Sequence, residues 1–379
     1  MPPCDISALA TPGLLLDLAK YDRNVERLRS HLARLSPGMT LRPHMKTVKS
    51  VELGKRLTKA LGTQAITVST LAEAEIYAEA GYRDILYAVG IAPGKLERVA
   101  ALVRRGVDCQ IVTDNVAMAR IVGRFCTDNA VALPVLIEVD CDGHRAGVKP
   151  EDAQTLLAIA HGLGPVAQLR GVMTHGGGSY AASSAEALNA FAQQEASAVR
   201  LAASALRKAG FAAPTVSAGS TPTALAKGNR EGVTEFRAGV FPFFDLVMAG
   251  IGVCEVDEIA LSVLTSVIGH QHDKGWIICD AGWMAMSRDL GTSGQALDYG
   301  YGQVCDADGR AISGLIVASA NQEHGIIAMR DGSAPPDIAV GTALRILPNH
   351  ACATAAQHQG YNVVEPGRAV RWSPRFSGW

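Results

Sequence analysis

The sequence predicts an α/β fold in which a (β/α)8 TIM barrel is followed by a mostly antiparallel β domain. Short β-rich runs alternate with stretches rich in Ala, Leu, Glu and Arg, and eight such units within roughly 200 residues are typical of this barrel. Beyond about residue 250, short apolar runs are separated by Gly, Asp and Pro with few helices between them, which indicates antiparallel strands. A doubly wound open sheet is the alternative, but no G-x-G-x-x-G motif follows a first strand.

The predicted barrel strands are short, and several are nearly continuous apolar runs, as expected for parallel strands covered on both faces. They span residues 40–46, 65–70, 84–89, 108–114, 135–140, 169–175, 215–220 and 234–240. Helices are predicted between most of them, for example at residues 51–61, 71–80, 93–105 and 185–209. A strand at residues 14–18 and a helix at residues 20–35 precede the first barrel strand.

The C-terminal part is predicted to contain strands at residues 261–269, 276–280, 315–320, 325–329 and 344–347. We therefore expect a barrel domain of residues 20–250 and a β domain of residues 251–379. The N-terminal segment, residues 1–19, is expected to add its strand to the β domain.

The composition limits the classes of function. With 48% hydrophobic residues in a chain of 379, a large core is expected, and the net charge of −1 gives no reason to expect a nucleic acid or an anionic membrane as partner. No apolar run approaches the ~18 residues of a membrane-spanning helix, and residues 1–6 lack the basic start of a signal peptide. Eight scattered cysteines without a C-x-x-C motif are typical of a reduced, cytoplasmic protein.

Reactive groups of such barrels lie at the C-terminal ends of the strands. The first strand ends in residues 42–46, RPHMK. A lysine that closes a buried strand is costly unless its charge is paired or removed, and a lowered pKa is what a Schiff-base lysine needs. Lys46 is therefore a candidate catalytic residue, with a solvated lysine beyond the barrel rim as the alternative.

Two further strand ends are polar. After the fifth strand, residues 138–145 include Glu138, Asp140, Asp142 and Arg145, which could hold a metal, orient a base or present the arginine to a cofactor. A solvated turn is the alternative. The sixth strand ends in residues 175–180, HGGGSY, where glycines permit close approach of the backbone to a ligand and a flexible loop is the alternative.

The loops after the seventh and eighth strands predict an anion site. Residues 217–223, SAGSTPT, place small residues and hydroxyls before a predicted helix, which is the composition of an anion-binding nest. The eighth strand runs into residues 237–240. Binding of phosphate by these two loops recurs in barrels, so the adjacent pair is a stronger signal than either loop alone.

A possible metal site lies far downstream, at His350 and Cys352. Two residues apart on an extended chain, these side chains point to one face, and both are zinc-type ligands. Two ligands are too few for a closed structural site, but they leave the open positions that a catalytic metal needs. A coincidental pair is the alternative.

Together these motifs resemble the D-serine dehydratase and D-threonine aldolase family of fold-type III pyridoxal-phosphate enzymes, whose barrel is related to that of alanine racemase. The resembling segments span nearly the whole chain, at residues 11–17, 42–47, 67–70, 142–147, 219–222 and 349–354. Within the family, residues 280–289 and 300–305 resemble an enzyme that acts on D-threo-3-hydroxyaspartate. The resemblance also implies a homodimer.

The resemblance implies a role for each candidate residue. Lys46 would hold pyridoxal 5'-phosphate in a Schiff base and act as the base at Cα. Residues beside the cofactor ring would be Arg145, His175 and Tyr180, of which Tyr180 approaches the pyridine nitrogen. The phosphate would be bound by Gly219, Ser220, Thr221, Gly239 and Val240. His350 and Cys352 would hold a divalent metal, which is zinc or else manganese, cobalt, nickel or magnesium.

The implied reaction is elimination of water from a D-3-hydroxy amino acid. The cofactor is an electron sink for a Cα carbanion, and a metal on the β-hydroxyl acts as a Lewis acid for a poor leaving group. D-threo-3-hydroxyaspartate would give oxaloacetate and ammonia, and D-serine would give pyruvate and ammonia. Candidates for binding a second substrate carboxylate are Arg42 and Arg288.

Three alternatives remain open. Retro-aldol cleavage to glycine and an aldehyde is the first, but aldolases of the group resemble His-Cys-Asp at the metal position, where this chain has His350, Ala351 and Cys352. They also tend to have Cys-Cys-Gln-Lys where residues 68–71 here are VSTL.

A racemase would need a second base such as Tyr299 or Tyr301, and a metal pair has no purpose in racemisation. A cofactor carrier without catalysis would leave the large β domain unexplained.

Overall fold

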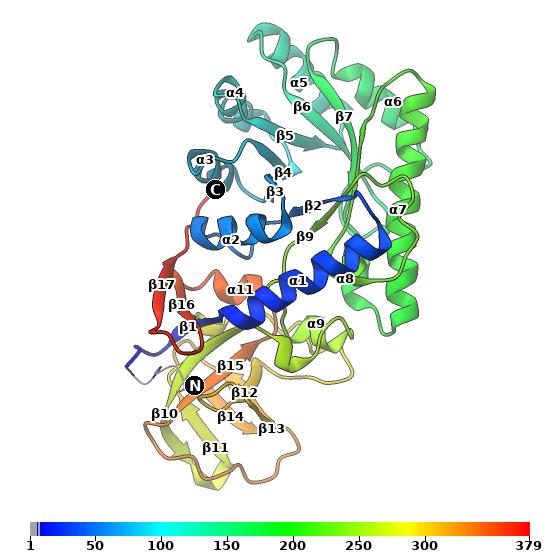
Figure 1. Ribbon diagram of the computed structural model, residues 1–379. Helices are drawn as coiled ribbons and strands as arrows, with labels where there is room; N and C mark the ends of the chain where they lie inside the picture. Colours follow the sequence, from blue (N-terminus) through cyan, green and yellow to red (C-terminus); the bar gives the residue numbers. More distant parts are fainter. Residues whose placement is uncertain (1–5, 7) are drawn as a thin grey trace. The chain divides into compact units, whose positions relative to one another are not determined.

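The computed structural model describes residue 6 and residues 8–379 (Figure 1). Cys4 and most of the segment on which the signal-peptide expectation rests lie outside the described residues. The chain forms two compact units, of which one is Arg27–Gly239 with Ser377–Trp379. The other consists of the described part of Met1–Glu26 and Val240–Phe376. We call them the barrel unit and the β unit.

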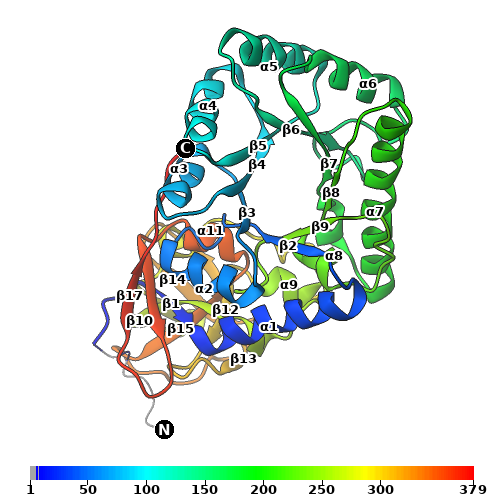
Figure 2. The same ribbon diagram turned by 45° about the horizontal axis from the view of Figure 1, so that its top comes forward.

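The barrel unit contains the eight parallel strands that the sequence predicts. They are β2 (Thr40–Pro43), β3 (Ala65–Val68), β4 (Asp84–Gly90), β5 (Asp108–Thr113), β6 (Pro134–Val139), β7 (Gln168–Thr174), β8 (Thr215–Ala218) and β9 (Glu235–Ala238). Their order is β2-β9-β8-β7-β6-β5-β4-β3. A parallel bridge between His44 and Thr67 closes these eight strands into a ring. Figure 2 shows the ring. The structure therefore confirms the predicted barrel.

Helices cover the outside of this ring (Figure 2). They are α2 (Val51–Leu61), α3 (Leu71–Glu79), α4 (Leu96–Arg104), α5 (Val116–Asp128), α6 (Ala153–Gly162), α7 (Ala185–Lys208) and α8 (Thr221–Leu225), with the 3-10 turns η1 (Pro93–Lys95) and η2 (Gly177–Ala181). Side-chain oxygens of Thr70, Asn115, Asp152 and Ser184 accept backbone N–H groups where α3, α5, α6 and α7 begin. Such caps satisfy donors that the first helical turn leaves unpaired.

The β unit contains one mixed sheet. Its strands are β1 (Gly13–Asp17), β10 (Leu261–Gln271), β11 (Trp276–Cys279), β12 (Gly302–Cys305), β13 (Ala311–Ala320), β14 (Gly325–Met329), β15 (Ala343–Pro348), β16 (Gly360–Val364) and β17 (Arg371–Pro374). The order is β11-β14-β13-β12-β15-β10-β1-β16-β17, and an additional β11–β10 pairing closes part of it into a small barrel. Neighbouring strands are antiparallel except for β1 and β16, so the predicted antiparallel domain is confirmed.

Short helices in the β unit connect these strands. They are α9 (Leu246–Gly250), η3 (Val256–Glu258), η4 (His272–Lys274), α10 (Trp283–Met286) and α11 (Ala351–Ala355). The two units meet along the chain at residues 26–27 and 239–240, whereas the sequence placed the boundaries at residues 19–20 and near 250. Helix α1 (Leu18–Leu35) begins in one unit and ends in the other, and helical periodicity alone cannot reveal such a division. None of the helices in the described chain is long and apolar enough to cross a membrane.

Candidate active site

Lys46 follows β2 at the C-terminal end of the barrel strands and is half-buried. A Cβ atom placed on Gly239 would lie 3.2 Å from His44 Cβ and 3.8 Å from Lys46 Cε, so the glycine leaves room beside the lysine. Burial, with the nearby charges of Lys46 and Arg145, lowers the pKa of His175 to about 3. Burial and the charge of Lys46 also lower the pKa of His44. Two neutral imidazoles therefore accompany the lysine.

The barrel interior beneath these residues is charged. Arg42 is 4% exposed and forms ion pairs with Asp84 (Nη1–Oδ1, 2.6 Å) and Glu235 (Nε–Oε2, 2.8 Å). Arg237 is also buried and donates to Ser217 Oγ. The expectation that Arg42 binds a substrate carboxylate is therefore wrong, because its guanidinium already holds two protein carboxylates. Position in a motif does not reveal whether an arginine points into the barrel or out of it.

The loops after β8 and β9 come together, as the predicted anion site requires. Gly219 has φ +122°, and a Cβ there would collide with the Arg237 carbonyl oxygen, so only glycine fits. Ser220 Oγ accepts from Thr223 N (3.3 Å) where α8 begins. Thr221 Oγ1 accepts from Gly239 N (3.3 Å), which joins the two loops. The structure thus gathers Gly219, Ser220, Thr221 and Gly239 around one place, and Val240 follows directly.

The glycine-rich loop after β7 packs against the same place. His175 Nδ1 lies 3.3 Å from Gly219 O, and its ring centroid is 6.2 Å from that of Tyr180. Ser179 Oγ and Ser220 Oγ are 3.1 Å apart. The two aromatic side chains predicted to lie beside the cofactor ring are therefore neighbours, next to the loops predicted to bind phosphate.

Glu195 on α7 fastens this loop and is a residue that sequence reasoning missed. It is completely buried, and its Oε1 accepts from Gly176 N at 2.6 Å. Burial raises the pKa of this carboxyl. A glutamate in the middle of a helix carries no sequence signal for such a contact, because the partner lies in another loop.

The acidic cluster after β6 is a turn that holds backbone, and this supports the turn interpretation over a metal site. Asp140 Oδ1 accepts from Gly143 N (2.7 Å), and Asp142 Oδ2 accepts from Gly178 N (2.8 Å). Arg145 is exposed, with its Nη2 3.6 Å from Glu138 Oε1. Arg145 also contributes to the lowered pKa of His175, so the two share one electrostatic environment.

The proposed metal ligands His350 and Cys352 lie where β15 leads into α11. His350 Nδ1 is 3.1 Å from Oδ2 of Asp245, which is completely buried. The same oxygen accepts from Ala351 N at 2.9 Å, and Asp245 Oδ1 accepts from Met248 N at 3.0 Å. A carboxylate can only accept, so Nδ1 carries a proton, and Nε2 is the nitrogen that could bind a metal once it releases its own proton.

Electrostatics at this pair favour a cation. Burial alone would lower the pKa of His350, but Cys352 and Asp245 raise it to about 11. The site therefore stabilises a positive charge at the imidazole, and a divalent metal bound by histidine nitrogen and cysteine sulfur supplies one. Among the described residues, no three His, Cys, Asp or Glu side chains are grouped so that they could hold a metal.

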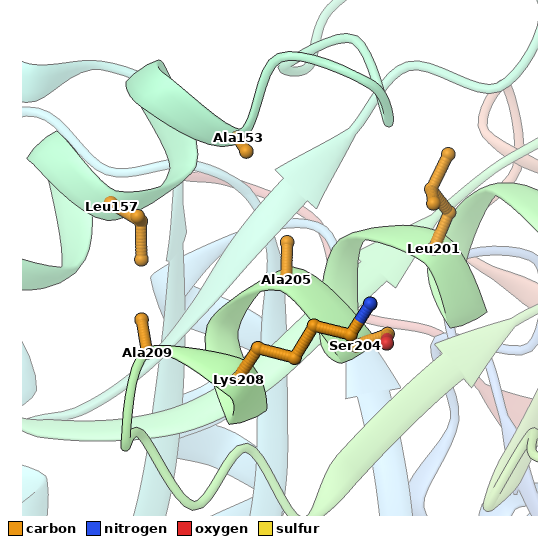
Figure 3. A pocket seen from close by; sticks show the side chains of 7 residues that line it. All are labelled: Ala153, Leu157, Leu201, Ser204, Ala205, Lys208 and Ala209. Carbon is orange, nitrogen blue, oxygen red and sulfur yellow. The ribbon is translucent and has the colours of Figure 1, made fainter.

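A pocket of about 400 Å³ on the outer layer of the barrel unit contains none of these residues. It lies between α6 and α7 (Figure 3) and is lined by Ala153, Leu157, Leu201, Ser204, Ala205, Lys208 and Ala209. This lining is mainly aliphatic and offers no acid–base pair or metal ligand, so the strand ends remain the candidate site.

Known proteins resemble the chain over nearly its whole length. Residues 16–246 match the family described as alanine racemase, N-terminal domain, and residues 260–364 match the family described as "Putative serine dehydratase domain". D-threo-3-hydroxyaspartate dehydratase of Delftia sp. (strain HT23) is 50% identical over 98% of this chain and 98% of its own. Its solved structure has a TM-score of 0.96 and covers 98% of this chain and 99% of that chain.

More distant relatives include both dehydratases and aldolases. D-serine dehydratase of Dictyostelium discoideum is 28% identical over 95% of this chain and 94% of its own. The 3-hydroxy-D-aspartate aldolase of Paracoccus denitrificans (strain Pd 1222) is 27% identical over 97% of this chain and 92% of its own.

Two solved variants of D-threo-3-hydroxyaspartate dehydratase replace a histidine and a cysteine two positions apart by alanine, and the cysteine variant is in the metal-free form. Both are 49% identical to this chain with a TM-score of 0.96; they cover 98% and 100% of it, and 96% and 100% of their own chains. His350 and Cys352 have the same spacing here. The chain belongs to the family in which an alanine racemase N-terminal domain is followed by a D-serine-dehydratase-like domain.

Proposed function

We propose that this protein is a pyridoxal-phosphate- and metal-dependent dehydratase, a carbon–oxygen lyase that eliminates water from a D-3-hydroxy amino acid. The preferred substrate is D-threo-3-hydroxyaspartate, which gives oxaloacetate and ammonia, and D-serine is the smaller substrate, which gives pyruvate and ammonia. The observation that carries the proposal is 50% identity to a dehydratase over 98% of both chains. The open His350–Cys352 pair agrees with it.

Residues of the barrel unit, together with Val240, which directly follows it in the chain, would bind the cofactor and move the α-proton. Bound pyridoxal phosphate supplies an electron sink for the electron pair left at Cα. Lys46 Nζ would hold the cofactor and accept the α-proton. The neutral His175 beside it adds no second positive charge next to Nζ. Arg145, His175 and Tyr180 would lie beside the cofactor ring. The phosphate would be bound by Gly219, Ser220, Thr221, Gly239 and Val240.

The β unit would bind the metal. A divalent ion held by His350 Nε2 and Cys352 Sγ supplies a Lewis acid that stabilises the departing hydroxide. Zinc fits this donor set, and manganese, cobalt, nickel and magnesium are the alternatives. Asp245 would keep the His350 ring in the orientation that presents Nε2.

Retro-aldol cleavage is the second candidate function, because an aldolase is 27% identical over 97% of the chain. In that reaction the β-hydroxyl loses its proton and the Cα–Cβ bond breaks. The sequence of residues 350–352, His-Ala-Cys, favours elimination, since aldolases of the group resemble His-Cys-Asp there.

The proposal also includes a homodimer in the cytoplasm. No disulfide bond joins the cysteines of the described chain, which agrees with a reducing compartment. Size-exclusion chromatography with light scattering would measure the oligomeric state.

Product analysis tests the function directly. Purified protein is supplied with D-threo-3-hydroxyaspartate or D-serine, with and without a chelator. We expect ammonia and a 2-oxo acid, lost on chelation and restored by added metal. Glycine with glyoxylate from the first substrate would instead establish the aldolase. Full activity in metal-free protein would contradict the Lewis-acid role.

A further inference from the structure

The segment from α10 to β12 is fastened to the chain on both sides of the metal-binding pair. The buried Asn349 side chain donates from Nδ2 to the carbonyl oxygens of Asp289 (3.0 Å) and Gly300 (2.6 Å). Thr354, also buried, donates from Oγ1 to Met286 O at 2.5 Å. Residues 286 and 289 are thus tied to residues 354 and 349. This arrangement holds the backbone of residue 288 next to the His350–Cys352 segment.

Buried polar contacts also hold the segment in one conformation. Thr292 is buried, and its Oγ1 donates to Asn349 Oδ1 (3.2 Å) and accepts from Tyr299 N (3.1 Å). Ser287 is buried at φ +86°, a conformation that non-glycine residues rarely adopt. Such residues persist where surrounding structure imposes the conformation, and they cluster at ligand sites.

Arg288 is the cation that this segment presents. It is exposed, and its guanidinium lies 4.9 Å from the ring centroid of Trp283. Within the described chain, the structure records no carboxylate paired with it. Stacking on an aromatic ring orients a guanidinium plane while leaving its N–H edge available for a bidentate carboxylate contact.

Three other buried or stacked arginines are already engaged. Arg42 holds Asp84 and Glu235, as described above. In the β unit, Arg330 lies over Tyr299 and donates to Asp298 O, and Arg375 donates to Tyr361 Oη and to backbone carbonyls. These guanidiniums donate hydrogen bonds to protein acceptors, whereas the described chain pairs no carboxylate with that of Arg288.

We propose that Arg288 binds the second carboxylate of a four-carbon substrate and so determines the preference for D-threo-3-hydroxyaspartate over D-serine. This inference rests on the proposed function and names the substrate class. The two substrates differ at the β-carbon, where one carries a carboxylate and the other a hydrogen. A cation next to the metal that binds the β-hydroxyl attracts the carboxylate of the first substrate and finds no such group on the second.

The test compares Arg288→Gln with wild type on both substrates. For D-threo-3-hydroxyaspartate we expect KM to rise and kcat/KM to fall about 10–100-fold, the size expected for a charged hydrogen bond. For D-serine, kcat/KM should change less than about twofold, because that substrate makes no such contact. Arg288→Lys keeps the charge but not the paired donors, so it should recover part of the loss. The matched control is Arg330→Gln, because Arg330 is also stacked on an aromatic ring of this unit. This variant should leave the ratio of the kcat/KM values for the two substrates unchanged.

Equal losses on both substrates, or no loss on either, would overturn the inference. A second measurement separates it from the proposed function. Calorimetry with succinate, an unreactive four-carbon dicarboxylate, should show weaker binding to Arg288→Gln than to wild type, whether or not the protein eliminates water. Circular dichroism of the two Arg288 variants checks that they fold. If wild type produces no 2-oxo acid yet succinate binding depends on Arg288, the function fails and the dicarboxylate site stands; unchanged succinate binding overturns the site.

Discussion

The two units build their functional groups in different ways. In the barrel unit, the candidate residues lie on loops that follow successive parallel strands, so each is placed by its own strand end. In the β unit, the segment of residues 349–354 is positioned by distant side chains. Asp245 contacts His350 across 105 positions, and Thr354 contacts Met286 across 68. A repeated βα architecture therefore lets the positions of candidate residues be predicted from sequence, whereas a site built from long-range side-chain contacts can be predicted only in part.

The largest effect is expected at the barrel unit's lysine. Lys46→Ala should abolish covalent attachment of the cofactor and lower the rate by at least about 10²–10⁴-fold, the typical worth of a positioned base. Loss of the visible absorbance of the attached cofactor and initial rates of 2-oxo acid formation measure this. Lys95→Ala, which removes the contact with Tyr87, is the control and should keep both. An active Lys46→Ala enzyme would exclude the lysine from the chemistry.

In the β unit, Asp245→Asn should weaken metal binding by about 10–100-fold. The amide can still accept from Met248 N, but it can no longer accept from both His350 Nδ1 and Ala351 N. Competition with a chromogenic chelator measures the dissociation constant independently of turnover. Asp152→Asn, which alters the aspartate that caps α6, is the matched control. Unchanged metal affinity in Asp245→Asn would show that the distant carboxylate is not needed, and the contrast between the units would weaken.

A smaller effect is expected where the barrel unit uses a long-range contact of its own. Glu195→Ala leaves Gly176 N without its acceptor, a cost of about 1–3 kcal/mol in stability, and should weaken cofactor binding about tenfold. Glu195→Gln retains an acceptor oxygen and should restore most of the affinity. Equilibrium dialysis of the cofactor and thermal unfolding measure the two quantities. Glu186→Ala, at the exposed start of the same helix, should change neither.

The pH dependence of Glu195 has a defined sign. Because burial raises its pKa in the folded protein, its proton is held more tightly when folded than when unfolded. The stability that this group contributes is present at pH values below the ordinary pKa of a glutamate. It is lost as the pH rises through the pKa that the group has in the folded protein. Glu195→Gln should therefore gain stability relative to wild type as pH rises, as urea unfolding at several pH values would show. If the difference in stability between Glu195→Gln and wild type did not change with pH, the carboxyl would be in a less buried environment.

The smallest expected effect is spectroscopic. His175, with its pKa lowered to about 3, should remain neutral at pH 5, as its ring nitrogen chemical shifts would report once His175→Gln has assigned the signal. Stability should decline as pH falls from the ordinary histidine value of about 6.5 toward 3, because only the unfolded chain then takes up the proton. A titration midpoint near 6.5 would mean that burial and Lys46 do not act on this ring.

Much of the barrel site was accessible from sequence because its residues occupy defined positions relative to strands. The predicted strand ends at Lys46, His175 and Ser220 lie where parallel pairing brings them. The strands β12, β16 and β17 were not predicted. Sequence reasoning did not find the roles of Asp245, Glu195 and Asn349, because each acts through a partner far along the chain. An aspartate before an apolar helix predicts a helix cap, and nothing in its neighbours indicates that it also holds a histidine.

Sequence alone was enough to predict the order of the barrel strands, the lysine at the end of the first of them and the histidine–cysteine spacing, because periodicity and spacing are local properties. Tertiary structure alone decided which charged side chains are available. Arg42 pairs with Asp84 and Glu235, whereas Arg288 stacks on Trp283 and has no carboxylate partner within the described chain. Both are arginines within motifs, and their difference arises from burial and pairing, which depend on contacts between segments distant in the chain.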